Sequence, residues 1–173
     1  MSWLARALLS AGMDVTLIVD GANVMGSRAD GWWRDRAGAM ARLHGELAAL
    51  AARGIGEPVP GDLPHSRGSG DAADGSSSAA APGAGEDDAD GRWYPQIVLV
   101  VEGRTRKVLS LVSPAPGVQV VAARGEGDDE IADLAGRLTG QRVVVTADRE
   151  LRRRVTSAGA TVTGPGWLLR QFR

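Results

Sequence analysis

The chain has no cysteine, only two histidines and a single lysine among its 173 residues. The absence of cysteine excludes a disulfide scaffold, thiol catalysis and every cysteine-ligated zinc or iron–sulfur site. With only His44 and His65, a histidine-rich metal site is not expected either. No apolar run approaches the ~18 residues of a membrane span, and the apolar stretch Trp3–Ala11 is short, contains Arg6 and is followed by no cleavage motif. We therefore expect a cytoplasmic protein without a membrane partner, for which Met13 is an alternative start.

Charge is unevenly distributed along the chain. The net charge is −1, yet residues 56–91 hold eight acidic residues and one basic residue. The rest of the chain therefore has 19 basic against 13 acidic residues, a net charge of +6. This excess is compatible with a nucleic-acid partner. Because all but one of the basic residues are arginines, the codon bias of a GC-rich genome explains the excess equally well.

Apolar runs typical of buried strands alternate with stretches of helical periodicity. The expected strands are Val15–Asp20, Gln96–Val101, Val118–Ala122, Arg142–Thr146 and Ala160–Val162. The expected helices are Arg34–Arg53, Asp128–Leu138, Asp148–Ala158 and Trp167–Phe172, and Gly21–Arg36 is expected to be a loop. This alternation predicts an α/β fold with a mainly parallel sheet of about five strands and helices on both faces. The length fits one domain over 15–173, preceded by an N-terminal extension over 1–14.

Residues 54–92 consist mostly of glycine, proline, serine, alanine and acids. A segment with so few large apolar side chains cannot bury enough surface to offset its ordering entropy. We expect a disordered acidic insertion between the first helix and the second strand. We do not interpret it as a domain boundary, because the sequence on neither side of it looks like a complete domain.

Acidic residues follow each of the first four predicted strands. Asp20 ends the first strand, Glu102 follows the second, Asp128 and Asp129 open the helix after the third, and Asp148 follows the fourth. Since ligands of open parallel sheets bind beyond the carboxyl ends of the strands, these acids should share one edge. Neighbouring carboxylates repel one another unless a cation compensates. An all-oxygen ligand set suits Mg²⁺ or Mn²⁺.

Each acid also has a structural interpretation. Asp128 and Asp148 are well placed to cap helices, and an acid at the position of Glu102 is more often part of a loop than a ligand. Asp20 is harder to explain in this way, because a carboxylate at the end of a wholly apolar strand is costly without a partner.

The sequence lacks the motifs of other common binding and catalytic sites of α/β proteins. The dinucleotide-binding pattern G-x-G-x-x-G fails in Gly125–Glu130 at its third glycine, and no phosphate-binding G-x-x-x-x-G-K-[ST] occurs. A phosphoaspartyl phosphatase would need a second aspartate where Ala22 stands. No serine lies in a G-x-S-x-G turn.

Three motifs together resemble a known family. Asp20–Val24 (DGANV), Gly127–Ile131 (GDDEI) and Thr146–Leu151 (TADREL) are similar to the NYN branch of the PIN-like nucleases, near the YacP-like bacterial group. The resemblance extends over Val15–Phe172 apart from the acidic insertion. It implies a three-layer PIN-like (Rossmannoid) fold and a metal-dependent ribonuclease.

The resemblance also implies roles for individual residues. Asp20, Asp128 and Asp148 would form the acidic core that binds Mg²⁺ or Mn²⁺, with Asn23 supporting the first acid. A metal held there would bind the scissile phosphate and lower the pKa of a bound water. One metal or two are both compatible with the sequence.

Two further acids are implied as auxiliaries, Glu102 and Asp129. The family more often carries aspartate where Glu102 stands. Of the adjacent pair Asp128–Asp129, we favour Asp128 for the core, because it lies three residues before the apolar Ile131 and nearer the start of the helix.

Candidate phosphate-binding residues are arginines in two groups. They are Arg28, Arg34 and Arg36 after the first motif, and Arg149 and Arg152, with Arg153, on one face of the last long helix. The second group is more typical of a solvated helix face than of a phosphate-binding site. Trp32 and Trp33 are candidates for stacking on bases, or for plugging the core beside the first helix.

The sequence thus predicts a metal-dependent endoribonuclease whose partner is RNA, such as ribosome-associated mRNA or a structured RNA. Two alternatives stay open. One is a catalytically weak RNA- or ribosome-binding module on the same fold, and the other is a phosphohydrolase of small nucleotides. The oligomeric state is left open.

Overall fold

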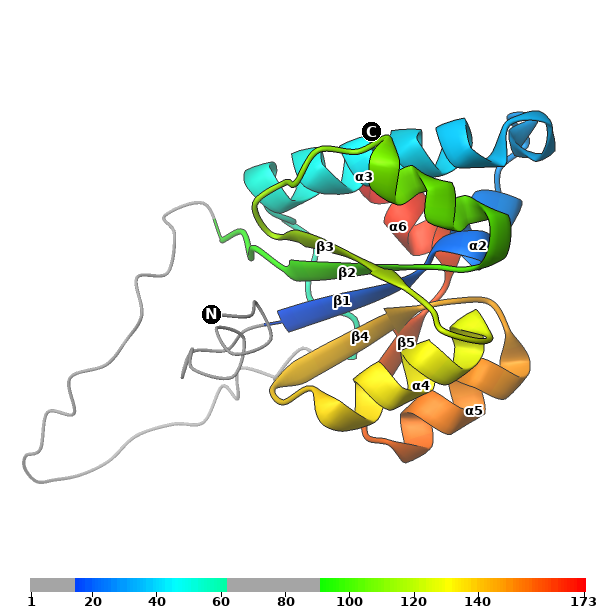
Figure 1. Cartoon of the computed structure of the whole chain (residues 1–173). Coiled ribbons are helices and arrows are strands. Elements are labelled where there is room, and N and C mark those ends of the chain that lie inside the picture. Colours follow the sequence, from blue (N-terminus) through cyan, green and yellow to red (C-terminus); the bar gives the residue numbers. More distant parts are fainter. Residues whose placement is uncertain (1–14, 62–90) are drawn as a thin grey trace, which may run out of the picture.

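The computed structural model describes residues 15–61 and 91–173 (Figure 1). The predicted N-terminal extension, the alternative start at Met13 and most of the predicted acidic insertion lie outside these ranges.

One five-stranded sheet forms the centre of the fold, and all of its strands are parallel. The strands are β1 (Val15–Asp20), β2 (Gln96–Val101), β3 (Val118–Ala122), β4 (Gln141–Val145) and β5 (Thr161–Thr163). Their order is β3-β2-β1-β4-β5, so β1 is central. The apolar composition of β1, β2 and β4 suits strands that are buried on both faces. The predicted α/β fold is confirmed, with a sheet that is entirely rather than mainly parallel.

Helices cover both faces of the sheet (Figure 1). They are α2 (Gly21–Gly26), α3 (Arg36–Arg53), α4 (Gly127–Arg137), α5 (Arg149–Ser157) and α6 (Pro165–Gln171), with 3₁₀ helices η1 (Trp32–Arg34) and η2 (Gly103–Ser110). Leu17 and Val19 of β1 pack with α3 and α6 in one apolar cluster. Ile18 packs with α4 and α5 in another. The alternation of β1 side chains between two cores produces the predicted three layers.

No helix within 15–61 or 91–173 combines the length and apolar character that a membrane crossing requires.

The predicted loop Gly21–Arg36 contains two short helices that the sequence did not reveal. Asp20 caps α2 through the backbone N–H of Asn23. Gly21 packs so closely on β2 that a Cβ atom there would lie 2.7 Å from the carbonyl oxygen of Val100. Six residues span less than two helical turns, too few for an apolar periodicity to show.

The stretch 54–92, predicted to be disordered, includes residues at both of its ends that the structure describes. Ile55 is fully buried and pairs with Trp93 in an antiparallel bridge. The indole of Trp93 stacks on Trp167 of α6, with ring centroids 6.5 Å apart and planes inclined by 17°. Tertiary contacts of a few apolar residues therefore order 54–61 and 91–92 despite their composition.

Candidate active site

Asp20 lies at the carboxyl end of β1 and is 7% exposed. Its Oδ1 accepts a hydrogen bond of 3.0 Å from the backbone N–H of Asn23, and its Oδ2 accepts one of 2.9 Å from the hydroxyl of Thr146. Contacts from two segments far apart in sequence thus fix the orientation of this carboxylate.

Thr146 and Asn23 join the ends of β1 and β4. The buried Thr146 hydroxyl, besides donating to Asp20, accepts a hydrogen bond of 3.1 Å from the backbone N–H of Asp148. Asn23 Oδ1 accepts one of 2.9 Å from the backbone N–H of Ala147. The turn that carries Asp148 is therefore held against the turn that follows β1.

Asp148 caps α5, as its structural interpretation predicted. Its Oδ1 accepts a hydrogen bond of 2.8 Å from the backbone N–H of Leu151. Capping and lining the cavity are compatible, because a carboxylate has about four acceptor positions.

Glu102 connects the end of β2 to the start of α4. Its Oε2 accepts a hydrogen bond of 2.6 Å from the backbone N–H of Gly127. A Cβ atom on residue 127 would lie 2.8 Å from this oxygen, so glycine leaves room for the contact. Asp128 follows directly and is thereby placed opposite the ends of β1 and β4.

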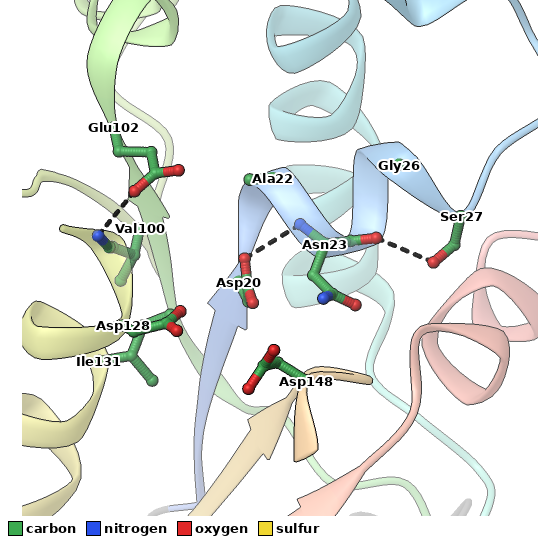
Figure 2. A pocket seen from close by; sticks show the side chains of 11 residues that line it. Asp20, Ala22, Asn23, Gly26, Ser27, Val100, Glu102, Asp128, Ile131 and Asp148 are labelled. Carbon is green, nitrogen blue, oxygen red and sulfur yellow. Dashed lines mark hydrogen bonds between the residues drawn. The ribbon is translucent and has the colours of Figure 1, made fainter. Parts of the chain in front are cut away.

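These segments enclose a cavity of about 470 Å³. Four carboxylates line it, from Asp20, Glu102, Asp128 and Asp148, together with Asn23. Figure 2 shows that Asp20, Asp128 and Asp148 point toward one another from three different segments. Among residues 15–61 and 91–173, however, no three acidic or histidine side chains are close enough to hold a metal ion in this arrangement. The carboxylates therefore surround the cavity without forming a closed ligand cluster.

The electrostatics of the cavity disfavour its negative charge. Burial raises the pKa of Asp20, hydrogen bonding lowers it, and the charges of Asp128 and Glu102 raise it further. The pKa of Asp128 is raised by burial and then by Asp148 and Glu102, against a lowering effect of Arg154. Repulsion among these groups would be relieved by a bound cation.

Asp129 is not brought to this cavity. Its carboxylate is 69% exposed and forms an ion pair of 2.8 Å with Arg154 of α5. Successive residues of a helix point about 100° apart, so the neighbours Asp128 and Asp129 cannot both face the cavity. The auxiliary role expected for Asp129 has no geometric support.

Arg28 is also placed differently from the expectation. It forms an ion pair with Glu46 of α3, its guanidinium lies 5.4 Å from the centroid of the Phe172 ring, and its side chain is only 15% exposed. These contacts tie the segment after α2 to α3 and to Phe172. Arg28 is therefore a structural residue rather than a free phosphate contact.

The other candidate arginines are exposed. Arg149 and Arg152 lie on α5 directly after Asp148, while Arg34 and Arg36 lie near the start of α3 and line a second cavity. Ser27 lines the acidic cavity although the sequence analysis did not single it out. No signal could have found it, because its position depends on the unforeseen helix α2.

Fold and site together define a class of protein, a three-layer α/β domain with an acidic cavity at the carboxyl edge of a parallel sheet. Among solved structures, the chain is similar to Rae1 (YacP) from Bacillus subtilis, with 17% sequence identity and a TM-score of 0.59 over 91% of this chain and 72% of that one. A structure of a point mutant of the same protein gives 17% identity and a TM-score of 0.56 over 92% and 75%. The chain thus shares the fold of Rae1 (YacP), in agreement with the fold that the resemblance of its motifs implied. No family model and no curated protein matches the sequence.

Proposed function

We propose that the protein is a metal-dependent endoribonuclease that hydrolyses phosphodiester bonds of RNA at the acidic cavity. The observation that carries the proposal is the convergence of four carboxylates, from the ends of β1 and β2 and the starts of α4 and α5, on one cavity. The pKa values of Asp20 and Asp128, both raised first by burial and then by neighbouring carboxylates, add to it, because perturbed acids in a cleft are typical of functional sites. The YacP-like fold, with its motif resemblance to ribonucleases, supports the same class.

The chemistry of the donors fits Mg²⁺ or Mn²⁺. All candidate ligands are oxygens, and the described side chains that line the cavity include no cation to balance the four acids. Asp20, Asp128 and Asp148 would hold the ion. When bound, it supplies charge stabilisation for the phosphate and a more acidic water.

The chain's own residues orient this site. Asn23 and Thr146 fix Asp20, and Glu102 fixes the first turn of α4, which presents Asp128. No side-chain nucleophile is required by a hydrolytic mechanism of this kind. Arg149 and Arg152, exposed just beyond Asp148, are proposed to contact RNA phosphates.

The proposal is tested by incubating the purified protein with single-stranded and structured RNAs in Mg²⁺, Mn²⁺ or EDTA. Cleavage is expected with a metal and absent in EDTA. Asp148→Asn should lower the rate by orders of magnitude and weaken metal binding in calorimetry. Asp129→Asn is the matched control, since it removes an equal charge outside the cavity and should leave both readouts near wild type. Absence of cleavage with either metal would contradict the proposal.

A second candidate is an RNA- or ribosome-binding module with little catalytic power. It is favoured by one observation, that no three acids of the described ranges are gathered into a metal site. For this candidate, RNA binding should be insensitive to Asp148→Asn. Arg149→Ala or Arg152→Ala should instead weaken binding and reduce its salt dependence.

A further inference from the structure

A second cavity, which we call the η1–η2 groove, lies on the α3 side of the molecule. Its volume is about 500 Å³, and its lining includes Trp33 and Arg34 of η1, Arg36 at the start of α3 and Lys107 of η2. Figure 1 places α2, the start of α3 and the start of η2 at the end of the molecule to which β1 and β2 point. The η1–η2 groove and the acidic cavity therefore share the carboxyl end of the sheet.

Trp33 is exposed to solvent, and an ordered turn over Asp30–Trp32 precedes it. Gly31 adopts a left-handed conformation with φ of 74°, and the Asp30 carboxylate accepts a hydrogen bond of 3.2 Å from the backbone N–H of Trp32. Trp32 packs against the apolar core and meets Trp33 edge-on, with centroids 6.3 Å apart and planes at 84°. Trp33 itself is 57% exposed. The prediction that a tryptophan plugs the core thus applies to Trp32. Trp33 packs against Trp32, and its ring is accessible to a ligand.

Positive charge surrounds this exposed indole. The lining includes one acid, Asp35, whose carboxylate already accepts the backbone N–H of Gly38 at 2.9 Å. Within 15–61 and 91–173, no ion pair joins Arg34, Arg36 or Lys107 to an acid. The guanidinium of Arg36 lies 5.4 Å from the centroid of the Trp32 ring, and its N–H groups have no acidic partner in the described ranges. The η1–η2 groove thus combines an open aromatic surface with cations that form no ion pair there.

We propose that the η1–η2 groove binds a single-stranded segment of RNA, with one base stacked on Trp33 and the flanking phosphates held by Arg34, Arg36 and Lys107. Stacking platforms beside cations are how proteins bind single strands without sequence preference. A duplex keeps its bases stacked inside and cannot offer one to Trp33. The identity of the ligand as the substrate strand rests on the proposed nuclease function.

Chain connectivity allows one strand to contact both sites. Ser27 lines the acidic cavity, and Trp33 follows it by six residues. Six residues span at most about 20 Å even when extended. A strand of several nucleotides that is anchored on Trp33 can therefore reach the four carboxylates.

The first test measures stacking in EDTA, so that no cleavage occurs. Fluorescein-labelled oligouridine is titrated with wild-type protein and variants, with anisotropy as the readout of affinity and tryptophan quenching as the signature of stacking. Trp33→Leu should weaken binding roughly 5- to 150-fold and remove most of the quenching, and Trp33→Phe should restore much of the affinity. Tyr94→Leu, which removes another exposed aromatic side chain outside the η1–η2 groove, should bind as wild type. The exposure of Trp33 makes misfolding unexpected, and thermal melts check this.

The second test separates stacking from charge. Each of Arg34→Ala, Arg36→Ala and Lys107→Ala should reduce the slope of log affinity against log salt by about 0.7, the contribution of one phosphate contact on a single strand. Trp33→Leu should weaken binding without changing that slope. A blunt duplex of oligouridine with oligoadenosine should bind more weakly than the single strand and show no quenching.

Three results would overturn the inference. They are wild-type affinity of Trp33→Leu, equal binding of duplex and single strand, and equally effective competition by polyglutamate, which would identify a general polyanion surface. These outcomes are independent of the nuclease proposal. Cleavage can persist while Trp33→Leu has no effect, and stacking can persist in a protein that cleaves nothing.

Discussion

Asp128 and Asp129 are adjacent in the first turn of α4, yet the charged groups nearest to them differ in sign. Asp128 faces three other carboxylates across the cavity, whereas Asp129 faces Arg154 in solvent. Both carboxylates lie in the first turn of α4, where the helix dipole acts on them. The pair therefore isolates the effect of the cavity on one charge.

We predict that Asp128→Asn stabilises the metal-free protein at neutral pH. Because the pKa of Asp128 is raised in the folded state, ionisation favours the unfolded chain, and the penalty is fully present above the folded pKa. The free energy of unfolding in EDTA should rise by about 0.2–1 kcal/mol at pH 7, the scale of interactions between partly exposed charges. The gain should vanish as the pH falls below about 4, near the unfolded pKa. Urea denaturation across this pH range measures it.

Asp129→Asn is the control for this measurement. It removes the same charge from the same helical turn but breaks the ion pair with Arg154, so no gain in stability is expected. An equal gain in both variants would show that the acidity of the helix start, and not the cavity, is responsible.

At the scale of elements, the position of α2 decides where Asn23 and Ser27 lie. This helix has only six residues, of which Gly21, Val24 and Met25 are buried. Its contact with β2 depends on the absence of a side chain at Gly21. The close approach of Gly21 to the backbone of β2 is thus a condition for the geometry of the cavity.

We predict that Gly21→Ala lowers the free energy of unfolding by about 1–3 kcal/mol, as overpacking does in a well-packed core. The added Cβ would lie 2.7 Å from the Val100 carbonyl oxygen, which the sheet holds in place. Gly26→Ala, at the other end of α2, meets only ordinary contact at 3.9 Å from the Trp32 ring and should be neutral or slightly stabilising. Urea denaturation of both variants is the measurement, and equal stability of the two would contradict this account of α2.

The limits of sequence-based prediction also lie at this scale. The strands β1, β2 and β4 were predictable because each contains a run of apolar residues. The shared edge of Asp20, Glu102, Asp128 and Asp148 follows from parallel pairing. The environment of Arg28 was not predictable, since its partner Glu46 lies 18 residues away and depends on how two helices meet. The roles of the acids in catalysis stay predictions.

At the scale of the whole molecule, the sheet interlocks two halves of the chain. The strand β1 and helix α3 come from residues 15–61, and the remaining strands come from 91–173. Because β1 lies between β2 and β4, the strand from the first half pairs on both sides with strands from the second half. Neither half can complete the sheet alone.

The bridge between Ile55 and Trp93 has a practical consequence for protein engineering. It joins Ile55 and Trp93, which lie on either side of 62–90 in the sequence, and every strand that the structure describes lies outside that range. We predict that a chain cut once there elutes as a single species in size-exclusion chromatography, and that the halves reassemble when they are produced separately. Trp93→Ala, which removes the stack on Trp167, should weaken this reassembly, while halves that separate after a single cut would contradict the prediction. The fold is therefore a candidate split reporter, in which two inactive polypeptides restore one domain on meeting.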